Sequence, residues 1–273
     1  MKKLPQYLFD LERFGASPAK ILARLNGSAA NAPRILTVTM PKSGTNLLQR
    51  ILVLHPALSR AWLPTLGRRN AKKWSRPREF FSPISSGKIV SSHFDFDEGL
   101  ARLMSEDLGY KILLMVRDPR DVVISDIHYI LTWPGHPLKD QISALPDDKA
   151  RMLELIEGRN GVRNIRDQIL RFSDWTKFAH TIRFEDAVGS GGGGSDSAQL
   201  SVVKDIFDYI DLPLTEADAR SIAANARSGK TQTFRTGRIR NWETLYDQDV
   251  KDAFRAVAGD LLIELGYETG TEW

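Results

Sequence analysis

The sequence predicts an α/β protein, a single domain with a mainly parallel central sheet flanked by helices. Short apolar runs of β type alternate along the chain with segments of helical spacing, and this alternation favours right-handed crossovers between parallel strands. The chain has 273 residues, 42% of them hydrophobic, which is enough for one full core and is an ordinary length for one α/β domain. We therefore treat residues 1–273 as one domain.

The expected strands are residues 35–39, 88–92, 111–116 and 180–184. Helical spacing predicts helices at residues 45–54, 97–108 and 119–130 between these strands, and further helices at residues 200–210 and 249–265. Gly266 is a plausible stop for the last of them because glycine suits the position just after a helix.

Two other segments have a simple interpretation. Residues 161–179 carry apolar side chains at helical intervals, so we expect this stripe to pack in the core. The stripe consists of Val162, Ile165, Ile169, Leu170, Phe172 and Trp175. The glycine- and serine-rich run from Gly189 to Ser195 predicts a flexible loop, either natural or an engineered linker.

The first chemical motif follows the strand at residues 35–39, where Pro41-Lys-Ser-Gly-Thr45 precedes a helix. Unpaired N–H groups and the positive end of the dipole make a helix N-terminus attractive to anions. Lys42 adds a charge, and Ser43 and Thr45 add hydroxyl donors. The turn differs from the P-loop of nucleoside triphosphatases because the lysine precedes the glycine.

The second motif, Arg117-Asp-Pro-Arg-Asp-Val-Val-Ile-Ser125, follows the strand at residues 111–116. Pro119 suits the first turn of a helix. Arg117 and Ser125 would then place two phosphate donors on one strand-to-helix unit. The alternative interpretation is that Arg117 and Asp121 form a surface ion pair and that Ser125 is incidental.

These motifs resemble those of sulfotransferases that use 3′-phosphoadenosine 5′-phosphosulfate. Residues 41–45 resemble the 5′-phosphosulfate loop, and residues 117–125 match every fixed position of the 3′-phosphate signature Arg-x-Pro-x-Asp-x-x-x-Ser. Residues 234–242 resemble the late loop over the nucleotide, and residues 181–186 resemble the Arg-Tyr-Glu-Asp strand end beside the adenine. Glycine-rich loops after that strand also occur in bacterial relatives of this family.

The resemblance implies a P-loop-like sulfotransferase fold and a set of nucleotide-binding residues. These are Lys42, Ser43, Gly44, Thr45, Asn46, Arg117, Ser125, Phe184, Arg235, Thr236 and Gly237. It also implies 3′-phosphoadenosine 5′-phosphosulfate as co-substrate, 3′,5′-diphosphoadenosine as product, and no metal. Thr236 replaces a family lysine, and Asn46-Leu47 replaces a threonine and an adenine-stacking tryptophan.

The same resemblance assigns the two catalytic residues. His93 ends the strand at residues 88–92, where the family places its catalytic histidine, and an imidazole can accept the proton of an acceptor hydroxyl. Lys42 would stabilise the departing phosphate oxygen. Ser91 stands where the family commonly has a lysine. The alternative for His93 is a structural histidine beside Phe94.

The acceptor is expected to be a small molecule that offers a hydroxyl or an amine. Aromatic side chains in two segments are candidates for its pocket, although each could equally belong to the core. The candidates are Trp62, Phe80, Phe81, His128, Tyr129 and Trp133. The acceptor's identity and the oligomeric state cannot be predicted from the sequence.

Composition excludes several other kinds of site and function. The chain has no cysteine, which excludes disulfides, thiolate catalysis and a cysteine-based zinc site. The N-terminus lacks a signal-peptide core and no apolar run approaches the length of a membrane span, so we expect a cytoplasmic protein without a membrane partner.

The formal charge of +4 is modest, but basic residues cluster within residues 68–78, interleaved with Trp74. This cluster could be a nucleic-acid footprint, a solvated loop or the border of the acceptor pocket. No nucleic-acid partner is expected. The alternatives to a sulfotransferase are a P-loop-type nucleotide kinase and a non-catalytic nucleotide or nucleic-acid binder.

Overall fold

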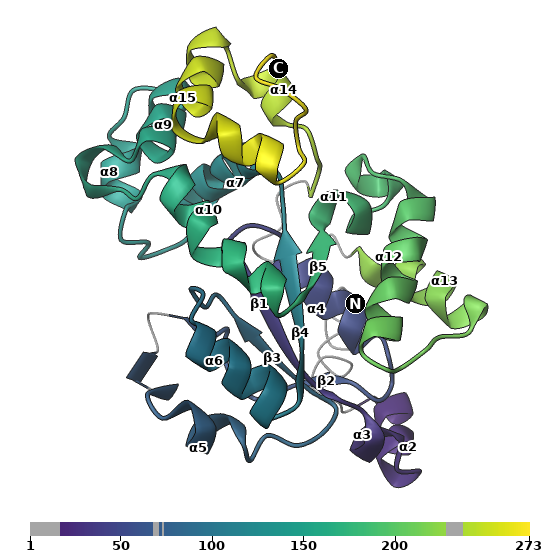
Figure 1. Cartoon of the computed structure of the whole chain (residues 1–273). Helices are drawn as coiled ribbons and strands as arrows, with labels where there is room; N and C mark the ends of the chain where they lie inside the picture. The colour runs from purple at the N-terminus through teal and green to yellow at the C-terminus, as the bar shows by residue number, and fades with distance from the viewer. Residues whose placement is uncertain (1–16, 68–70, 73, 228–236) are drawn as a thin grey trace.

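The computed structural model describes residues 17–67, 71–72, 74–227 and 237–273 of the chain. Within these ranges the chain forms one five-stranded sheet in the order β2-β3-β1-β4-β5, and every neighbouring pair is parallel (Figure 1). The strands are β1 (Arg34–Thr39), β2 (Ser59–Arg60), β3 (Lys88–Ser92), β4 (Tyr110–Val116) and β5 (His180–Arg183). The predicted α/β class with a mainly parallel sheet is confirmed.

The four predicted strands correspond to β1, β3, β4 and β5 within one residue at each end. The two-residue strand β2 was missed because so short a run has no recognisable alternation. Phe184 was predicted to end β5, but it begins α11 (Phe184–Ala187).

The strands end at a common edge of the sheet. Val38 of β1 pairs with Ser92 of β3, and Thr39 pairs with Met115 of β4. Strand β5 ends level with β4. The residues that directly follow these strands are Met40, His93, Arg117 and Phe184. The carboxyl edge of a parallel sheet is where α/β proteins bind ligands, and the register brings the predicted site residues to that edge.

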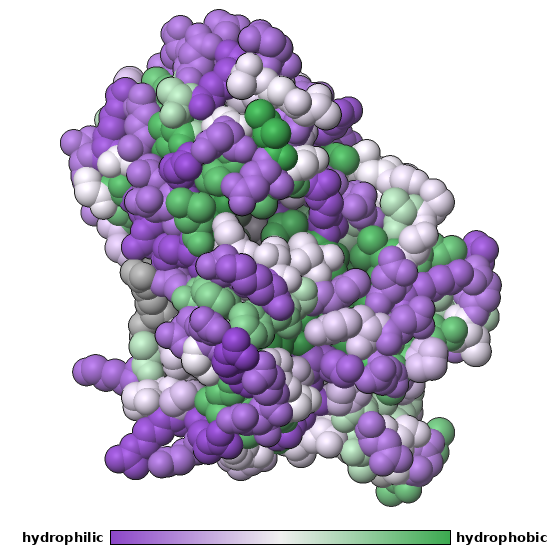
Figure 2. All heavy atoms as spheres, viewed as in Figure 1, coloured by the Kyte–Doolittle hydropathy of each residue, from purple (hydrophilic) through white to green (hydrophobic). Residues whose placement is uncertain are grey.

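Helices cover both faces of the sheet (Figure 1). The longer ones are α2 (Pro18–Leu25), α4 (Thr45–Val53), α7 (Pro119–Thr132), α9 (Asp148–Glu157), α10 (Ile165–Ser173), α12 (Asp196–Tyr209), α13 (Glu216–Ala226) and α15 (Gln248–Glu264). The short ones are α3 (Ser28–Asn31), α5 (Pro77–Phe81), α6 (Glu98–Arg102), α8 (Lys139–Ser143), α14 (Trp242–Leu245) and a π-helical turn at Leu103–Asp107. The face of the molecule seen in Figure 2 is mostly hydrophilic, with smaller apolar areas between the polar ones. None of the helices in the described ranges combines the length and apolar character needed to cross a membrane.

Alternation along the strands produces two hydrophobic cores. Leu36 and Val38 of β1 lie in one core with α7, α9, α10 and α15, whereas Ile35 lies in the other with α4, α12 and α13. Successive side chains of a strand point to opposite faces, so a strand covered on both sides contributes to both cores.

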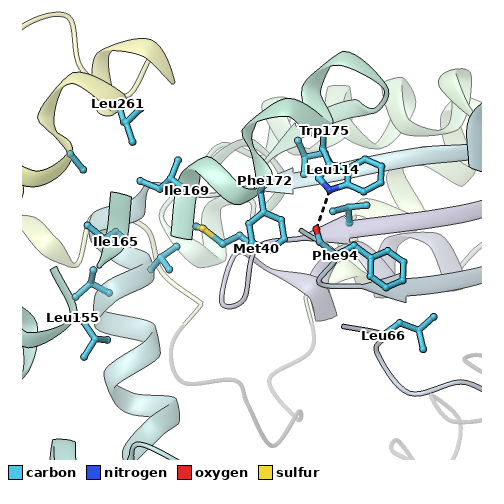
Figure 3. Close-up of a cluster of buried hydrophobic side chains, with 14 of the residues drawn as sticks. Met40, Leu66, Phe94, Leu114, Leu155, Ile165, Ile169, Phe172, Trp175 and Leu261 are labelled. Carbon is cyan, nitrogen blue, oxygen red and sulfur yellow. Dashed lines mark hydrogen bonds between the residues drawn. The ribbon is translucent and has the colours of Figure 1, made fainter. Parts of the chain in front are cut away.

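The segment after β3 is held by α10 and the 3₁₀ turn that follows it (Asp174–Lys177). Trp175 is fully buried, and its Nε1 donates to the Phe94 carbonyl at 3.0 Å (Figure 3). Phe96 N donates to Arg171 O at 2.7 Å, and Arg171 pairs with Asp95. These contacts fix the backbone next to His93.

The predicted apolar stripe is correct except at Leu170, which is 47% exposed. The helix begins only at Ile165, where Asn164 caps it by accepting from Asp167 N. Ile169 faces the core with Ile165 and Phe172 (Figure 3), and Leu170, one residue further, is turned to solvent.

Residues 189–195 differ from the loop expected of a linker. They form a 3₁₀ turn (Ser190–Gly192) closed by three backbone hydrogen bonds of 2.9–3.0 Å, and Gly192 is buried. The run of glycines therefore forms a packed turn in this structure.

Ile169 and its neighbour provide a matched test of the core. We expect Ile169→Ala to lower the free energy of unfolding by about 2–5 kcal/mol, because it leaves a cavity in the core. Leu170→Ala should change it by less than about 0.5 kcal/mol, since its side chain is largely exposed. Chemical denaturation of both variants measures the difference, and equal losses would contradict the assignment of faces on α10.

Candidate active site at the carboxyl edge of the sheet

The loop between β1 and α4 turns through two residues with left-handed backbone, Lys42 (φ 71°) and Gly44 (φ 110°). Ser43 N donates to Met40 O at 3.1 Å, which closes the turn. Thr45 and Asn46 are the first residues of α4, so their backbone N–H groups have no acceptor within the helix. The predicted sequence of strand, turn and helix N-terminus is therefore present at the end of the central strand.

Only glycine fits at position 44. A Cβ there would lie 2.5 Å from Phe184 Cδ2 and 2.8 Å from Met115 Sδ, and the backbone is in the region that other residues avoid. The loop therefore rests directly on Phe184, which is buried at the start of α11.

Arg117 is 8% exposed. It links the loop at residues 41–45 to residues 237–242, the late segment of the chain. Its guanidinium donates to Lys42 O at 3.3 Å and to Arg238 O at 2.8 Å, and it lies 4.5 Å from the centre of the Phe184 ring. Its Nη2 is 3.5 Å from Asp121 Oδ2. Arg117 and Asp121 therefore form the ion pair of the alternative interpretation, but the pair is buried and not on the surface.

Asp121 holds the late segment against α7. Its carboxylate accepts from Arg240 N at 2.8 Å and from Trp242 N at 3.2 Å. Burial raises the pKa of Asp121, and Arg117 opposes that rise. The predicted residues Arg235 and Thr236 lie outside the described residues, whereas Gly237 is described and has φ 54°.

Two buried polar atoms of this site have no hydrogen-bond partner among the described residues: Ser43 Oγ and Arg117 Nε. Buried polar groups are almost always paired in native proteins. Each could donate to an acceptor oxygen of a bound ligand, so the two donors fit a ligand that carries phosphate or sulfate ester groups. Ser125, the other predicted phosphate donor, is half-buried on α7.

His93 is held in one tautomer by the end of β1. Its Nδ1 lies 2.7 Å from Thr39 O and 3.1 Å from Thr39 Oγ1. A carbonyl oxygen can only accept, so Nδ1 carries the proton and Nε2 keeps a free lone pair. Burial lowers the pKa of His93, the bond to Thr39 opposes this, and Lys42 lowers it further. The lowered pKa favours the neutral form of the His93 imidazole near pH 7.

A hydrogen-bond chain joins this histidine to residues 41–45, the predicted anion loop. Thr39 Oγ1 is 2.7 Å from Thr45 Oγ1 and also contacts His93. Ser91, which replaces a family lysine, is buried, and its hydroxyl accepts from Gln49 Nε2 at 2.7 Å. The position that would supply a second cation is therefore a neutral hydrogen-bonded group.

Lys42 lies against α7. Its Nζ is 4.2 Å from the centre of the Tyr129 ring, a cation–π contact. Burial lowers the pKa of Lys42, Asp126 opposes this, and Arg117 lowers it further. Burial likewise raises the pKa of Asp126 to about 6, although Lys42 opposes the rise. Tyr129 and Asp126 are three residues apart, so they share one face of α7.

Asp126 was missed by the sequence prediction. Its signal was the one carboxylate in the mostly apolar run from Val122 to Ile130, directly after Ser125. A lone acidic residue on the inner face of a helix needs a positive partner, and Lys42 supplies that charge.

A cavity of about 520 Å³ borders His93. Its apolar lining comes from the segment after β3, the following helix and one earlier tryptophan: Phe94, Phe96, Leu100, Leu103 and Trp74. The aromatic pair that directly follows His93, Phe94 and Phe96, was the sequence signal for this lining.

None of the six residues predicted for the acceptor pocket lines this cavity. Phe81 is fully buried and packs on Phe94 and Tyr110, and Phe80 packs on Phe81. Trp62 is 77% exposed. His128, Tyr129 and Trp133 belong to α7 and its end, where Tyr129 contacts Lys42 and Trp133. Sequence could not distinguish these aromatic side chains from those that face the cavity.

The family model described as the sulfotransferase domain matches residues 32–182, more than half of the chain. The chain belongs to the sulfotransferase family. The match contains the anion loop, His93 and Arg117–Ser125, whereas the late segment lies beyond it. A search of curated proteins found no match.

Solved sulfotransferases share the fold. Mouse sulfotransferase SULT7A1 complexed with PAP superposes with a TM-score of 0.65 at 17% identity, covering 88% of this chain and 90% of that one. Retinol dehydratase in complex with androsterone and inactive cofactor PAP gives 0.59 at 12% identity, covering 87% and 84%. Retinol dehydratase with retinol and PAP gives 0.57 at 12% identity, covering 87% and 85%. The predicted sulfotransferase fold is confirmed.

Gly44 tests the geometry of the sulfotransferase loop. We expect Gly44→Ala to lower the free energy of unfolding by about 1–3 kcal/mol, because the added methyl strains the left-handed backbone and collides with Phe184. Gly270→Ala is the control, since a Cβ there meets nothing within 4 Å. Chemical denaturation measures both, and a Gly44→Ala protein as stable as the control would contradict the packing of the loop on Phe184.

Proposed function

We propose that this sulfotransferase moves a sulfonate group in line from 3′-phosphoadenosine 5′-phosphosulfate to a hydroxyl, or an amine, of a small molecule. The observation that carries the proposal is the hydrogen-bond chain from Thr45 through Thr39 to His93. This chain supports the proposal because it joins the His93 ring, through Nδ1, to the loop that would bind the donor's sulfonate end.

The donor's phosphates would be held by residues from three segments. The loop residues Ser43, Gly44, Thr45 and Asn46 offer hydroxyl or backbone N–H groups toward the 5′-phosphosulfate. Arg117 and Ser125 would hold the 3′-phosphate, together with the late residues Arg235, Thr236 and Gly237. Phe184 would border the base. The fit rests on the buried Ser43 hydroxyl and Arg117 Nε, which need acceptor atoms.

The nucleotide in the related structures agrees with this assignment. PAP, which is 3′,5′-diphosphoadenosine, is named in the complexes of mouse SULT7A1 and of retinol dehydratase. It is the product that remains after the sulfonate has left the donor. The 3′-phosphate in PAP is the group for which Arg117, buried beside the anion loop, supplies a charge.

The donor supplies a sulfonate whose leaving group is a phosphate oxygen. His93 Nε2 accepts the proton of the acceptor hydroxyl as its oxygen attacks sulfur, and Thr39 holds the ring while it becomes charged. The Lys42 ammonium stabilises the negative charge on the departing oxygen. Asp126 keeps Lys42 protonated despite burial, because a nearby carboxylate favours the charged amine.

The acceptor would occupy the cavity beside His93. The lining is largely aromatic and aliphatic, which suits a hydroxyl carried on an apolar body. Androsterone and retinol, named in the retinol dehydratase complexes, are molecules of this kind. Trp62, Phe80, Phe81, His128, Tyr129 and Trp133, which the sequence suggested for the acceptor, do not line this cavity.

The alternative of a nucleic-acid binder gains no support from the basic segment. Arg68, Arg69 and Lys73 lie outside the described residues. Arg76 and Arg78 are exposed, but each pairs with a carboxylate, Glu79 and Asp107 respectively. The alternative of a P-loop kinase is disfavoured by the order of lysine and glycine in the loop.

Nucleotide affinity tests the donor assignment. We expect 3′,5′-diphosphoadenosine to bind at least about tenfold more tightly than AMP, because a charged hydrogen bond to the 3′-phosphate contributes about 1.5–3 kcal/mol. Isothermal titration calorimetry measures both constants. Equal affinities would contradict the proposed phosphate site.

His93 tests the base assignment. His93→Ala should reduce kcat on a hydroxyl acceptor by about two to four orders of magnitude, because general-base catalysis contributes that much. Nucleotide affinity should hardly change, and His93→Asn should be no better. His180→Ala is the control, since His180 stacks on Tyr209 at the start of β5, away from the carboxyl edge. Unchanged turnover in folded His93→Ala would move the base to another residue, with His128 the next candidate.

A further inference from the structure

The glycine-rich turn, residues Gly189–Gly194, lies directly after α11 and is ordered by its own hydrogen bonds. Gly192 N and Gly194 N both donate to Gly189 O, at 3.0 and 2.9 Å. Ser190 donates to the Asp196 carboxylate from its backbone N at 2.8 Å and from its hydroxyl at 2.9 Å. Two of its carbonyls, those of Gly191 and Gly192, are engaged by the rest of the chain.

Those two neighbouring carbonyls accept hydrogen bonds from residues twelve apart in the sequence. Gly191 O accepts from Arg227 Nη1, and Gly192 O accepts from Ile239 N at 3.0 Å. Arg227 directly follows α13, and Ile239 precedes α14. The glycine-rich turn therefore ties together the end of one helix and the approach to the next.

At Gly192 and Gly194 the turn lies so close to neighbouring backbone that neither position has room for a side chain. A Cβ on Gly192 would overlap Val188 Cγ2 and lie 2.6 Å from Gly237 O. A Cβ on Gly194 would lie 2.7 Å from Glu185 O. Separations below 3.0 Å to backbone atoms require the backbone to move, so any larger residue at position 192 displaces Gly237.

Gly237, which Gly192 contacts, is directly followed by a residue that binds the buried Arg117. Arg238, between Gly237 and Ile239, accepts from Arg117 Nη2 at 2.8 Å. Arg240 N, one residue beyond Ile239, donates to Asp121. The backbone at 237–240 is thus held on one side by the glycine-rich turn and on the other by the Arg117–Asp121 pair.

We propose that Gly191 and Gly192 position the late segment against Arg117 and so determine the affinity for the 3′-phosphate of the donor. The proposal rests on the proposed function, because it concerns the same nucleotide. It assigns a role to a turn whose composition alone suggested a linker. Gly191 and Gly192 are positioning residues, since they act through Arg238 and Ile239.

The test compares the affinities of 3′,5′-diphosphoadenosine and AMP for the wild-type protein and for Gly192→Ala. Gly192→Ala should weaken 3′,5′-diphosphoadenosine binding by roughly tenfold, since it displaces a backbone that accepts a charged hydrogen bond, and should change AMP binding by less than about twofold. The donor KM should rise, whereas kcat at saturating donor should stay within about twofold, because His93 and Lys42 are not displaced.

A second variant covers the case in which Gly192→Ala does not fold. Val188→Ala combined with Gly192→Ala removes the overlap with the Val188 side chain but keeps the collision with Gly237 O. Val188→Ala alone is its matched control, and thermal unfolding verifies that both are folded. The loss of 3′,5′-diphosphoadenosine affinity should appear in the double variant and be absent from Val188→Ala.

The outcomes separate the two proposals. A double variant that binds 3′,5′-diphosphoadenosine as tightly as Val188→Ala would overturn the role of the glycine-rich turn and leave the proposed function standing. Equal weakening of AMP and 3′,5′-diphosphoadenosine would also overturn it, since the effect would not concern the 3′-phosphate. Wild-type protein that fails to prefer 3′,5′-diphosphoadenosine over AMP would overturn the donor assignment, and the positioning role with it.

Discussion

Thr39 makes the contacts on which the arrangement of the site depends. Its carbonyl fixes the tautomer of His93, and its hydroxyl reaches both that ring and Thr45 at the start of α4. This is possible because β1 is the central strand, with β3 on one side and β4 on the other. A shift of one residue in the β1–β3 register would place His93 on the wrong side of the sheet edge, since side chains alternate between faces.

Burial strengthens the attraction between opposite charges of this site and also disfavours the charged form of each group. The pKa of Lys42 is lowered and that of Asp126 is raised, so burial disfavours the charged form of both groups while their mutual attraction opposes it. Arg117 has a buried counter-charge in Asp121 but leaves Nε without a partner among the described residues. In the proposed function, acceptor oxygens of the nucleotide would pair with Arg117 Nε, which Asp121 leaves without a partner.

The sequence predicted what depends on local chemistry. The anion loop, Arg117 and His93 each follow a recognisable strand, and parallel strands bring their carboxyl ends together whatever the details of packing. Whether an aromatic side chain lines a cavity depends on the direction it faces, and sequence spacing did not distinguish the buried Phe81 from Phe96 beside the cavity. The glycine-rich run left two interpretations open, because glycine serves flexibility in a linker and also lack of volume where two backbones meet. The structure shows such a close backbone approach at Gly192.

The residues around the two proposed substrate sites draw on both hydrophobic cores. Phe184, Val188 and Ile239, which support the nucleotide side, pack in the core with α4 and α12. Phe94, Leu100 and Trp74, which line the cavity beside His93, pack in the core with α7 and α10. The residues proposed for the 3′-phosphate also lie over this second core, because Ser125 belongs to α7 and Trp242 is buried there. Substitutions that reshape the cavity therefore act on a core that also supports part of the phosphate site, so we expect them to affect donor binding as well as acceptor preference.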